Sequence, residues 1–243
     1  MKLWKSWVIA TKDFSIFRKK KRILYTLIIL PLLISIGLPI IISFMTQIDN
    51  PTTEIVSLLN AFSYFYIILA FIQSNTLASY SILGEKIEQS IEPLLATPTT
   101  DSELLFGKTI ASFLPCIGVI YASSIIFMVL SDAVTYNTIG YLFFPNLSMA
   151  FILLLAVPLS SILSIQLSVI ISSRVNDVRT ANQLGSLLFI PFIGVYLLLV
   201  TNVISLNIIN LFVISIVLFL IDAVLFYISK AIFRRDEILT KWK

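Results

Sequence analysis

The sequence predicts an all-α integral membrane protein with six transmembrane helices and both termini in the cytoplasm. The first observation is composition: 58% of the 243 residues are hydrophobic and only 12% are charged. Soluble domains carry about 25% charged residues, so this chain has too little polar surface to cover a globule. The second observation is a set of uncharged runs of the length a spanning helix needs, about 20 residues. The third is the placement of the basic residues.

The first 22 residues precede any span and predict an amphipathic interfacial helix. Trp4, Trp7 and Phe14 recur at roughly helical spacing among lysines, which suits a helix lying in the headgroup plane. An anchoring tail held only by the basic cluster at 18–22 is the alternative.

The uncharged runs divide into six predicted spans. Residues 133–147 are rich in turn formers and are expected to form an outer loop. The run 180–221 has twice the length of one span, and Asn202, Asn207 and Asn210 lie near its middle, so it should fold back as two helices. The predicted spans cover about 23–46, 55–83, 109–131, 148–172, 184–202 and 207–229.

The basic residues all fall on one side of this arrangement. The N-terminal segment, the segments 85–108 and 174–179 and the C-terminus contain all 17 Lys and Arg residues. The other side carries Asp49, Glu54 and Asp132 and no basic residue. The positive-inside rule then predicts a cell-membrane protein with cytoplasmic termini.

The sequence offers few residues that could form a catalytic, metal-binding or nucleotide-binding site. It has no His, the usual neutral-pH base and commonest metal ligand, and one Cys. Asp222 is the one acid deep in a span, and pairing with Lys230 is favoured over a proton relay. The run 102–109 ends like a phosphate loop but lacks the first Gly and a preceding strand, so it predicts no nucleotide site. An integral membrane enzyme is therefore disfavoured, and an energy source outside the chain is expected.

The segment 85–96 predicts a short cytoplasmic helix. Glu85, Glu88 and Glu92 are spaced to share one face, and Leu94 and Leu95 belong to an apolar face. Such an acidic helix would be repelled by anionic lipid, which favours contact with a basic groove on a partner protein. The alternative is a solvated helix that merely joins two spans.

The run 84–98, followed by Glu103-Leu-Leu-Phe-Gly-Lys108, resembles the signature of ABC-2 type permease subunits of ABC transporters. The usual form is Glu-Lys-Glu-x-Gly-Thr-x-Glu-x-Leu-Leu-Ala-Thr-Pro; here Gln89 replaces the Gly and Ser90 the Thr. The stretch 172–185 is also similar to the corresponding family segment. The resemblance covers residues 1–243 as a single transmembrane domain.

The resemblance implies a permease that pairs with a second permease chain, identical or different, and docks on separate ABC ATPase subunits. ATP and Mg would be bound by those subunits, so no cofactor or metal is expected in this chain, and membrane lipids rather than nucleic acid are its surroundings. The segment 85–96 would be the coupling helix. The implied ATPase contacts are Glu85, Glu88, Ser90, Glu92, Leu94 and Leu95, with Arg174, Asp177 and Arg179 as a second set. A stand-alone secondary carrier or channel is the competing hypothesis.

Four uncharged polar residues are expected at membrane depth: Gln73, Asn75, Thr76 and Gln166. Such groups tie helices together through hydrogen bonds, or they line a translocation path. Because the spans are otherwise so apolar, an exported cargo is expected to be hydrophobic or amphipathic: a lipid, a drug-like molecule or a peptide.

Overall fold

The computed structural model describes residues 3–46, 52–87, 99–175, 177–201, 203 and 207–232. Every regular element in these ranges is helical, and none of the described residues forms a strand. Six helices are long and apolar enough to cross a membrane: Ile23–Thr46, Thr52–Glu85, Ser102–Ile139, Leu147–Ser172, Val178–Val200 and Ile208–Ser229. The predicted all-α fold with six spans is thereby confirmed.

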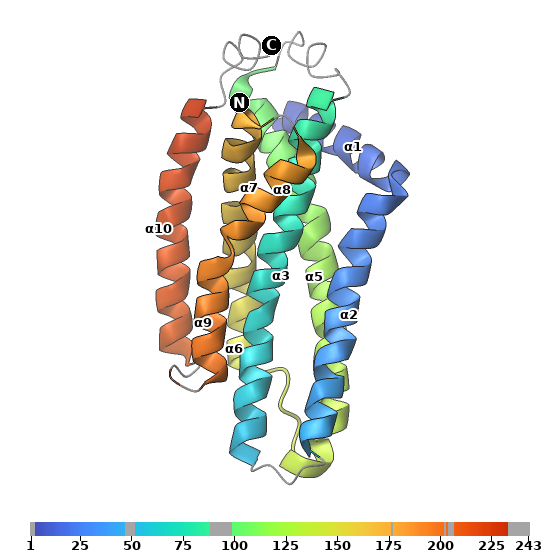
Figure 1. Ribbon diagram of the computed structural model, residues 1–243, viewed down its shortest axis with the longest axis vertical. Coiled ribbons are helices and arrows are strands. Elements are labelled where there is room, and N and C mark those ends of the chain that lie inside the picture. The colour runs from blue at the N-terminus through green and yellow to red at the C-terminus, as the bar shows by residue number, and fades with distance from the viewer. Residues whose placement is uncertain are drawn as a thin grey trace.

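The helices form an elongated bundle (Figure 1). The first part of the chain supplies α1 (Leu3–Lys19), α2 (Lys21–Thr46), α3 (Thr52–Ile87) and α5 (Asp101–Ile139). The second part supplies α6 (Leu147–Phe151), the π-helical turn η1 (Ile152–Ala156), α7 (Val157–Arg174), α8 (Val178–Leu187), α9 (Ile190–Val200) and α10 (Ile208–Ile232). The short helix α1 lies at one end of the bundle, together with the last turn of α3 and the first turn of α5 (Figure 1).

The centre of the bundle is α3, the most buried of the six spans. Serines on α7 form hydrogen bonds to the backbone of α3. Ser160 Oγ donates to the Ile67 carbonyl at 3.2 Å, and Ser164 Oγ donates to the Phe71 carbonyl at 2.5 Å. Small hydroxyl residues let helices approach closely in a membrane, and such bonds contribute about 0.6 kcal/mol each. The α3–α7 pair is therefore the tight core around which the other helices pack.

The helix α5 extends far beyond the predicted span 109–131. With 39 residues, α5 is about 58 Å long at about 1.5 Å per residue, well beyond the roughly 30 Å of a hydrocarbon core. It begins in a capping box, in which Thr100 and Glu103 satisfy each other's backbone N–H groups. It ends at Gly140, whose φ of +82° is a left-handed cap that glycine adopts without strain. The predicted outer loop thus starts only at Gly140, because Thr135 bonds back to the Ser131 carbonyl and stays helical.

The fifth span is made of two helices. The segment Leu188–Phe189 separates α8 from α9, and Pro191 occupies the first turn of α9, where its missing N–H is tolerated. The span starts at Val178, six residues before the predicted start at 184. Residues 178–183 of α8 were not expected to belong to it, because they were assigned to a cytoplasmic loop that contains Arg179.

Candidate functional site

A group of charged residues lies where α1, α3 and α5 meet. Lys12 and Asp13 come from α1, Ser81 and Glu85 from the last two turns of α3, and Lys108 from the second turn of α5. We call these five residues the charged cluster. Glu85 comes before and Lys108 after residues 88–98, which lie outside the described residues.

Lys108 is the centre of the charged cluster. Its Nζ lies 2.6 Å from Glu85 Oε2 and 3.7 Å from Asp13 Oδ2, and it donates to the Ser81 carbonyl at 2.7 Å. Only 3% of the Lys108 side chain is exposed. Lys12, which is 43% exposed, donates to the other Glu85 oxygen at 2.7 Å. The two lysines and the two carboxylates therefore balance each other in charge. Their contacts also join α1, α3 and α5.

Asp13 is the less well compensated carboxylate of the two. Burial raises its pKa above the usual range even though Lys108 and a 2.5 Å hydrogen bond from Ser81 Oγ act in the opposite direction. Its Oδ1 has no hydrogen-bond partner among the described residues. Glu85, held by two lysines, is thus the principal anion of the charged cluster.

The helix α1 packs closely against α5. A Cβ at Gly107 would lie 2.7 Å from the Ser6 carbonyl oxygen and 2.9 Å from Ile9 Cβ, so only glycine permits this approach. Ser6 Oγ also donates to the Glu103 carbonyl at 2.9 Å. The opposite face of α1 leaves Trp4 exposed. The helix therefore presents tryptophan outward, which suits the predicted interfacial position, and also has a protein-facing side that sequence reasoning missed.

The predicted coupling segment is placed only in part. Residues 85–87 belong to α3, while Glu88, Ser90, Glu92, Leu94 and Leu95 lie outside the described residues. Glu85 does not lie on an exposed acidic edge. Its carboxylate points into the protein, because Lys108 reaches it from α5 and Lys12 from α1.

The second predicted contact set is exposed. Asp177 caps α8 by accepting hydrogen bonds from the Thr180 N–H at 3.3 Å and the Thr180 hydroxyl at 3.2 Å. Arg174 and Arg179 flank it and are also exposed. These residues belong to the junction of α7 and α8, which lies at the same end of the bundle as α1 (Figure 1).

The polar residues within the spans make ties inside the bundle. Gln73 donates to the Thr26 and Leu27 carbonyls of α2 at 3.3 and 3.2 Å. Asn75 donates to the backbone and side-chain oxygens of Asn182 in α8, both at 3.3 Å. That approach needs Gly185, since a Cβ there would collide with the Asn75 side chain.

The other two residues of this set make weaker or purely local contacts. Thr76 bonds within its own helix to the Ile72 carbonyl at 3.0 Å. Gln166 is mostly buried, and its backbone carbonyl accepts from Ser229 of α10 at 3.4 Å. The bonds of Gln73 and Asn75 agree with the role of helix ties, and a role of the four residues in a translocation path stays a prediction.

Asp13, Lys12, Ser81 and Lys108 were not singled out from the sequence. Two signals were present: Asp13 is the one acid among the many basic residues of the first 22, and Lys108 directly precedes an apolar run. Neither signal identifies the partner, because the partners lie far apart in the sequence, as Lys108 and Asp13 do.

Six apolar helices, with ionic contacts gathered at one end of the bundle, define a multi-pass membrane protein. The family model described as "ABC-2 family transporter protein" matches residues 7–213. The chain therefore belongs to the ABC-2 transporter family and is the membrane component of a transport system, not itself a catalyst. Membership implies partnership with an ABC ATPase subunit. A comparison with curated proteins found no match.

Proposed function

We propose that this permease is the transmembrane subunit of an ATP-driven exporter and that residues 85–96 couple it to separate ATPase subunits. Two permease chains and two ATPase subunits would form the transporter. The ATPase subunits would bind ATP and Mg in the cytoplasm of the cell, on the side of both termini of this chain.

The observation that carries this proposal is the ion pair between Glu85 and Lys108, the two residues that flank the segment 86–107. The ion pair of 2.6 Å between Glu85 and Lys108 joins the end of α3 to the start of α5, and Asp13 and Lys12 join both to α1. A force applied by an ATPase on residues 88–98 would therefore reach three helices together. A buried ion pair transmits such a force well, because separating its charges inside the protein is strongly unfavourable.

The exposed residues Arg174, Asp177 and Arg179 supply a second surface for the same partner. They lie at the junction of α7 and α8, and within the described residues they make no ion pair with each other. Exposed charges of this kind direct partner choice and association rate more than affinity.

The cargo we propose is hydrophobic or amphipathic. Within the described residues, Asp222 is the one charged side chain near the middle of a span, and it is buried against the bundle. A path for inorganic ions would require rings of charged groups or of carbonyls. A lipid, a drug-like amphiphile or an apolar peptide suits this interior better.

The experiment is charge reversal of the segment with a matched control. Glu88→Lys combined with Glu92→Lys should abolish co-purification of the ATPase, or abolish the response of its rate to the permease, while membrane insertion is retained. Glu54→Lys makes the same kind of charge change at the other end of α3 and should leave both readouts unchanged. If the ATPase still co-purifies with the doubly reversed chain and its rate still responds, the coupling assignment is wrong.

The cargo is tested with the reconstituted complex. Candidate lipids, drug-like amphiphiles and apolar peptides should stimulate ATP hydrolysis, whereas inorganic ions and polysaccharide should not. Uptake that is driven by an ion gradient without ATP would instead favour the stand-alone carrier.

A further inference from the structure

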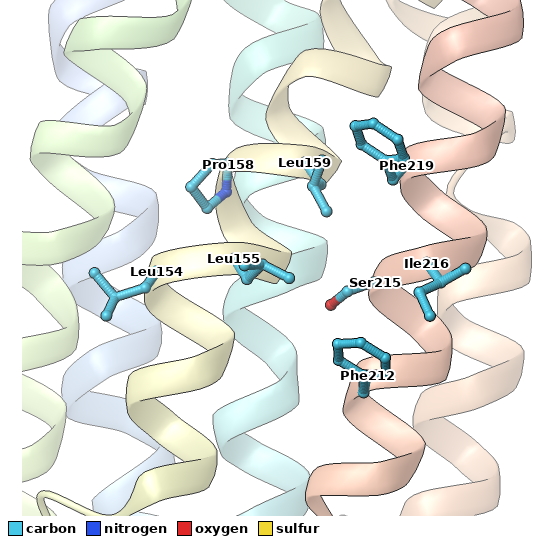
Figure 2. Close-up of a pocket in the computed structure, with 8 residues that line it drawn as sticks. All are labelled: Leu154, Leu155, Pro158, Leu159, Phe212, Ser215, Ile216 and Phe219. Atoms are coloured by element: carbon cyan, nitrogen blue, oxygen red, sulfur yellow. The ribbon is translucent and has the colours of Figure 1, made fainter.

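An open groove of about 340 Å³ lies on the side of the bundle between η1–α7 and α10 (Figure 2). Eight of the described residues line it, of which seven are apolar and the eighth is Ser215. Leu154, Leu155 and Pro158 form one wall, and Phe212 and Phe219 belong to the other. Sites for small molecules are commonly about 300–1,000 Å³, largely apolar and equipped with a few polar groups, and this groove has that character.

A hydrogen bond from α5 stabilises the π-helical turn η1, which forms one wall of the groove. In this turn the N–H of Val157 bonds to the Ile152 carbonyl, five residues back. The next residue is Pro158, which has no N–H, so the Leu153 carbonyl lacks its equivalent donor. The Tyr121 hydroxyl of α5 supplies one at 2.8 Å. Single π-helical turns are frequent at functional sites, and this one is stabilised by a dedicated bond.

The hydroxyl of Ser215 is buried and unpaired. The residue is 2% exposed, and its Oγ has no hydrogen-bond partner among the described residues. A helical serine ordinarily satisfies itself by bonding to a carbonyl one turn back, as Ser63 does with Leu59. Figure 2 shows the Ser215 oxygen pointing from α10 toward the α7 wall. A ligand in the groove would meet this one polar group.

The groove opens on the outer surface of two spans. Leu154 is 73% exposed and Phe219 61% exposed, and both lie within helices that are long and apolar enough to cross the membrane. Ser215 is seven residues into α10, about 10 Å from its start at about 1.5 Å per residue. With a hydrocarbon core about 30 Å thick, the groove then lies within one leaflet. A molecule that enters from this side comes through the lipid chains.

We propose that the groove between η1–α7 and α10 binds the acyl chain of a membrane lipid and that the Ser215 hydroxyl donates a hydrogen bond to the ester carbonyl of that lipid. The apolar walls match a hydrocarbon chain, and none of the described lining residues is charged, which argues against recognition of a headgroup there. The lipid supplies the acceptor that Ser215 lacks. This site is independent of the coupling to an ATPase.

The test uses the full-length chain in phosphatidylcholine vesicles that contain a phosphatidylcholine with a photoactivatable group in its acyl chain. Cross-linked peptides are mapped by mass spectrometry. Labelling is expected to concentrate on residues 154–159 and 212–219 relative to Val224, which is exposed on α10 but does not line the groove. Leu155→Trp fills the groove and should reduce this labelling to the level at Val224. Val217→Trp places the same bulk on another face of α10 and should leave it unchanged.

A second variant isolates the hydrogen bond. Ser215→Ala keeps the groove open, so labelling by an ester-linked probe should fall to that of an ether-linked probe, which has no carbonyl. Equal labelling around α10, or no change in Leu155→Trp, overturns the proposal. So does cross-linking of two chains through Phe219→Cys in a Cys116→Ala background without lipid labelling, which would assign the groove to contact between copies.

Discussion

The charged end of α3 and the outer helix α10 are held to the bundle in different ways. At the charged end, ion pairs of 2.6 and 2.7 Å join α3 to α5 and α1. The helix α10 packs against α7 and buries apolar residues such as Leu211 and Leu218 in the core. Ser229 of α10 also donates a 3.4 Å bond to the Gln166 carbonyl. Lipid chains are as apolar as leucine, so apolar packing alone gives little preference for a helix neighbour over lipid.

This difference indicates which helices of the permease are most firmly held to one another. Among the described residues, the ion pairs are concentrated where α1, α3 and α5 meet. The groove beside α10 lies where the contacts are largely apolar and one hydroxyl is unpaired. We infer that α1, α3 and α5 respond to a partner as one unit, and that lipid competes for the α10 side.

The largest expected effect is that of Lys108→Ala. It leaves the carboxylates of Glu85 and Asp13 buried without their central cation, and breaking a buried ion pair typically costs about 3–5 kcal/mol. A marked fall in the melting temperature of the purified protein is expected. Lys12→Ala removes the 43% exposed partner and should cost about 1 kcal/mol or less. Equal shifts for the two variants would show that burial does not distinguish the lysines.

Next in size is Gly107→Ala. Its methyl group would lie 2.7 Å from the Ser6 carbonyl oxygen, so α1 must move away from α5, at a cost of about 1–3 kcal/mol. Gly118 lies in the same helix, and a methyl group added there would have no neighbouring atom within 4 Å. Gly118→Ala should therefore be neutral or stabilise by up to about 1 kcal/mol. Thermal melting of both variants checks the prediction. A Gly107→Ala protein as stable as the native chain would contradict the close packing of α1 against α5.

A smaller effect is expected for Tyr121→Phe. It removes the donor to the Leu153 carbonyl beside the groove and should cost about 0.6–1.7 kcal/mol, the range of such bonds in membranes. Tyr25→Phe, at an exposed position on α2, is the control and should change little. Hydrogen exchange at residues 152–157 measures the π-helical turn directly. Unchanged protection there would mean that the turn does not depend on Tyr121.

The smallest effect is expected for Asp13→Asn, and it depends on pH. Because burial raises the pKa of Asp13, proton binding favours the folded state, and the carboxyl contributes most below its ordinary pKa. That contribution is lost as the pH rises through the raised value. The groups facing it are Lys108, Glu85, Lys12 and Ser81.

Asn keeps the size of the side chain and an acceptor for Ser81, so the variant should lack this decline. The melting temperature of the native chain, relative to that of Asp13→Asn, should fall as the pH increases from about 4. A difference between the two proteins that is constant with pH would contradict the raised pKa.

Hydropathy and charge placement were sufficient to predict the helical class and six spans, because spanning length and apolarity are properties of each segment alone. The acidic spacing of 85, 88 and 92 predicts a shared helix face, and of these three residues the structure describes only Glu85. The spacing does not predict the direction of the Glu85 side chain. Its direction is set by Lys108 and Lys12, which approach from other helices. The π-helical turn is equally hidden, since a run of leucines predicts a regular helix and the bond from Tyr121 arises only in the folded bundle.

The extra length of α5 follows from local effects that were underestimated. Thr135 forms a bond within the helix, and Gly140 provides the stop seven residues beyond Ala133, where the outer loop was expected to begin. The polar residues in the spans were recognised from the sequence, but their partners, such as Asn182 for Asn75, depend on the packing of α8 against α3.

The most direct test is a pair of spin-label distances in the complex with the ATPase, measured with and without ATP in a Cys116→Ala background. One pair of labels joins exposed Val8 in α1 to exposed Phe106 in α5, and the other joins Val8 to exposed Tyr227 in α10. We predict that ATP leaves the Val8–Phe106 distance unchanged and changes the Val8–Tyr227 distance. A change in the Val8–Phe106 distance with a fixed Val8–Tyr227 distance would contradict the account.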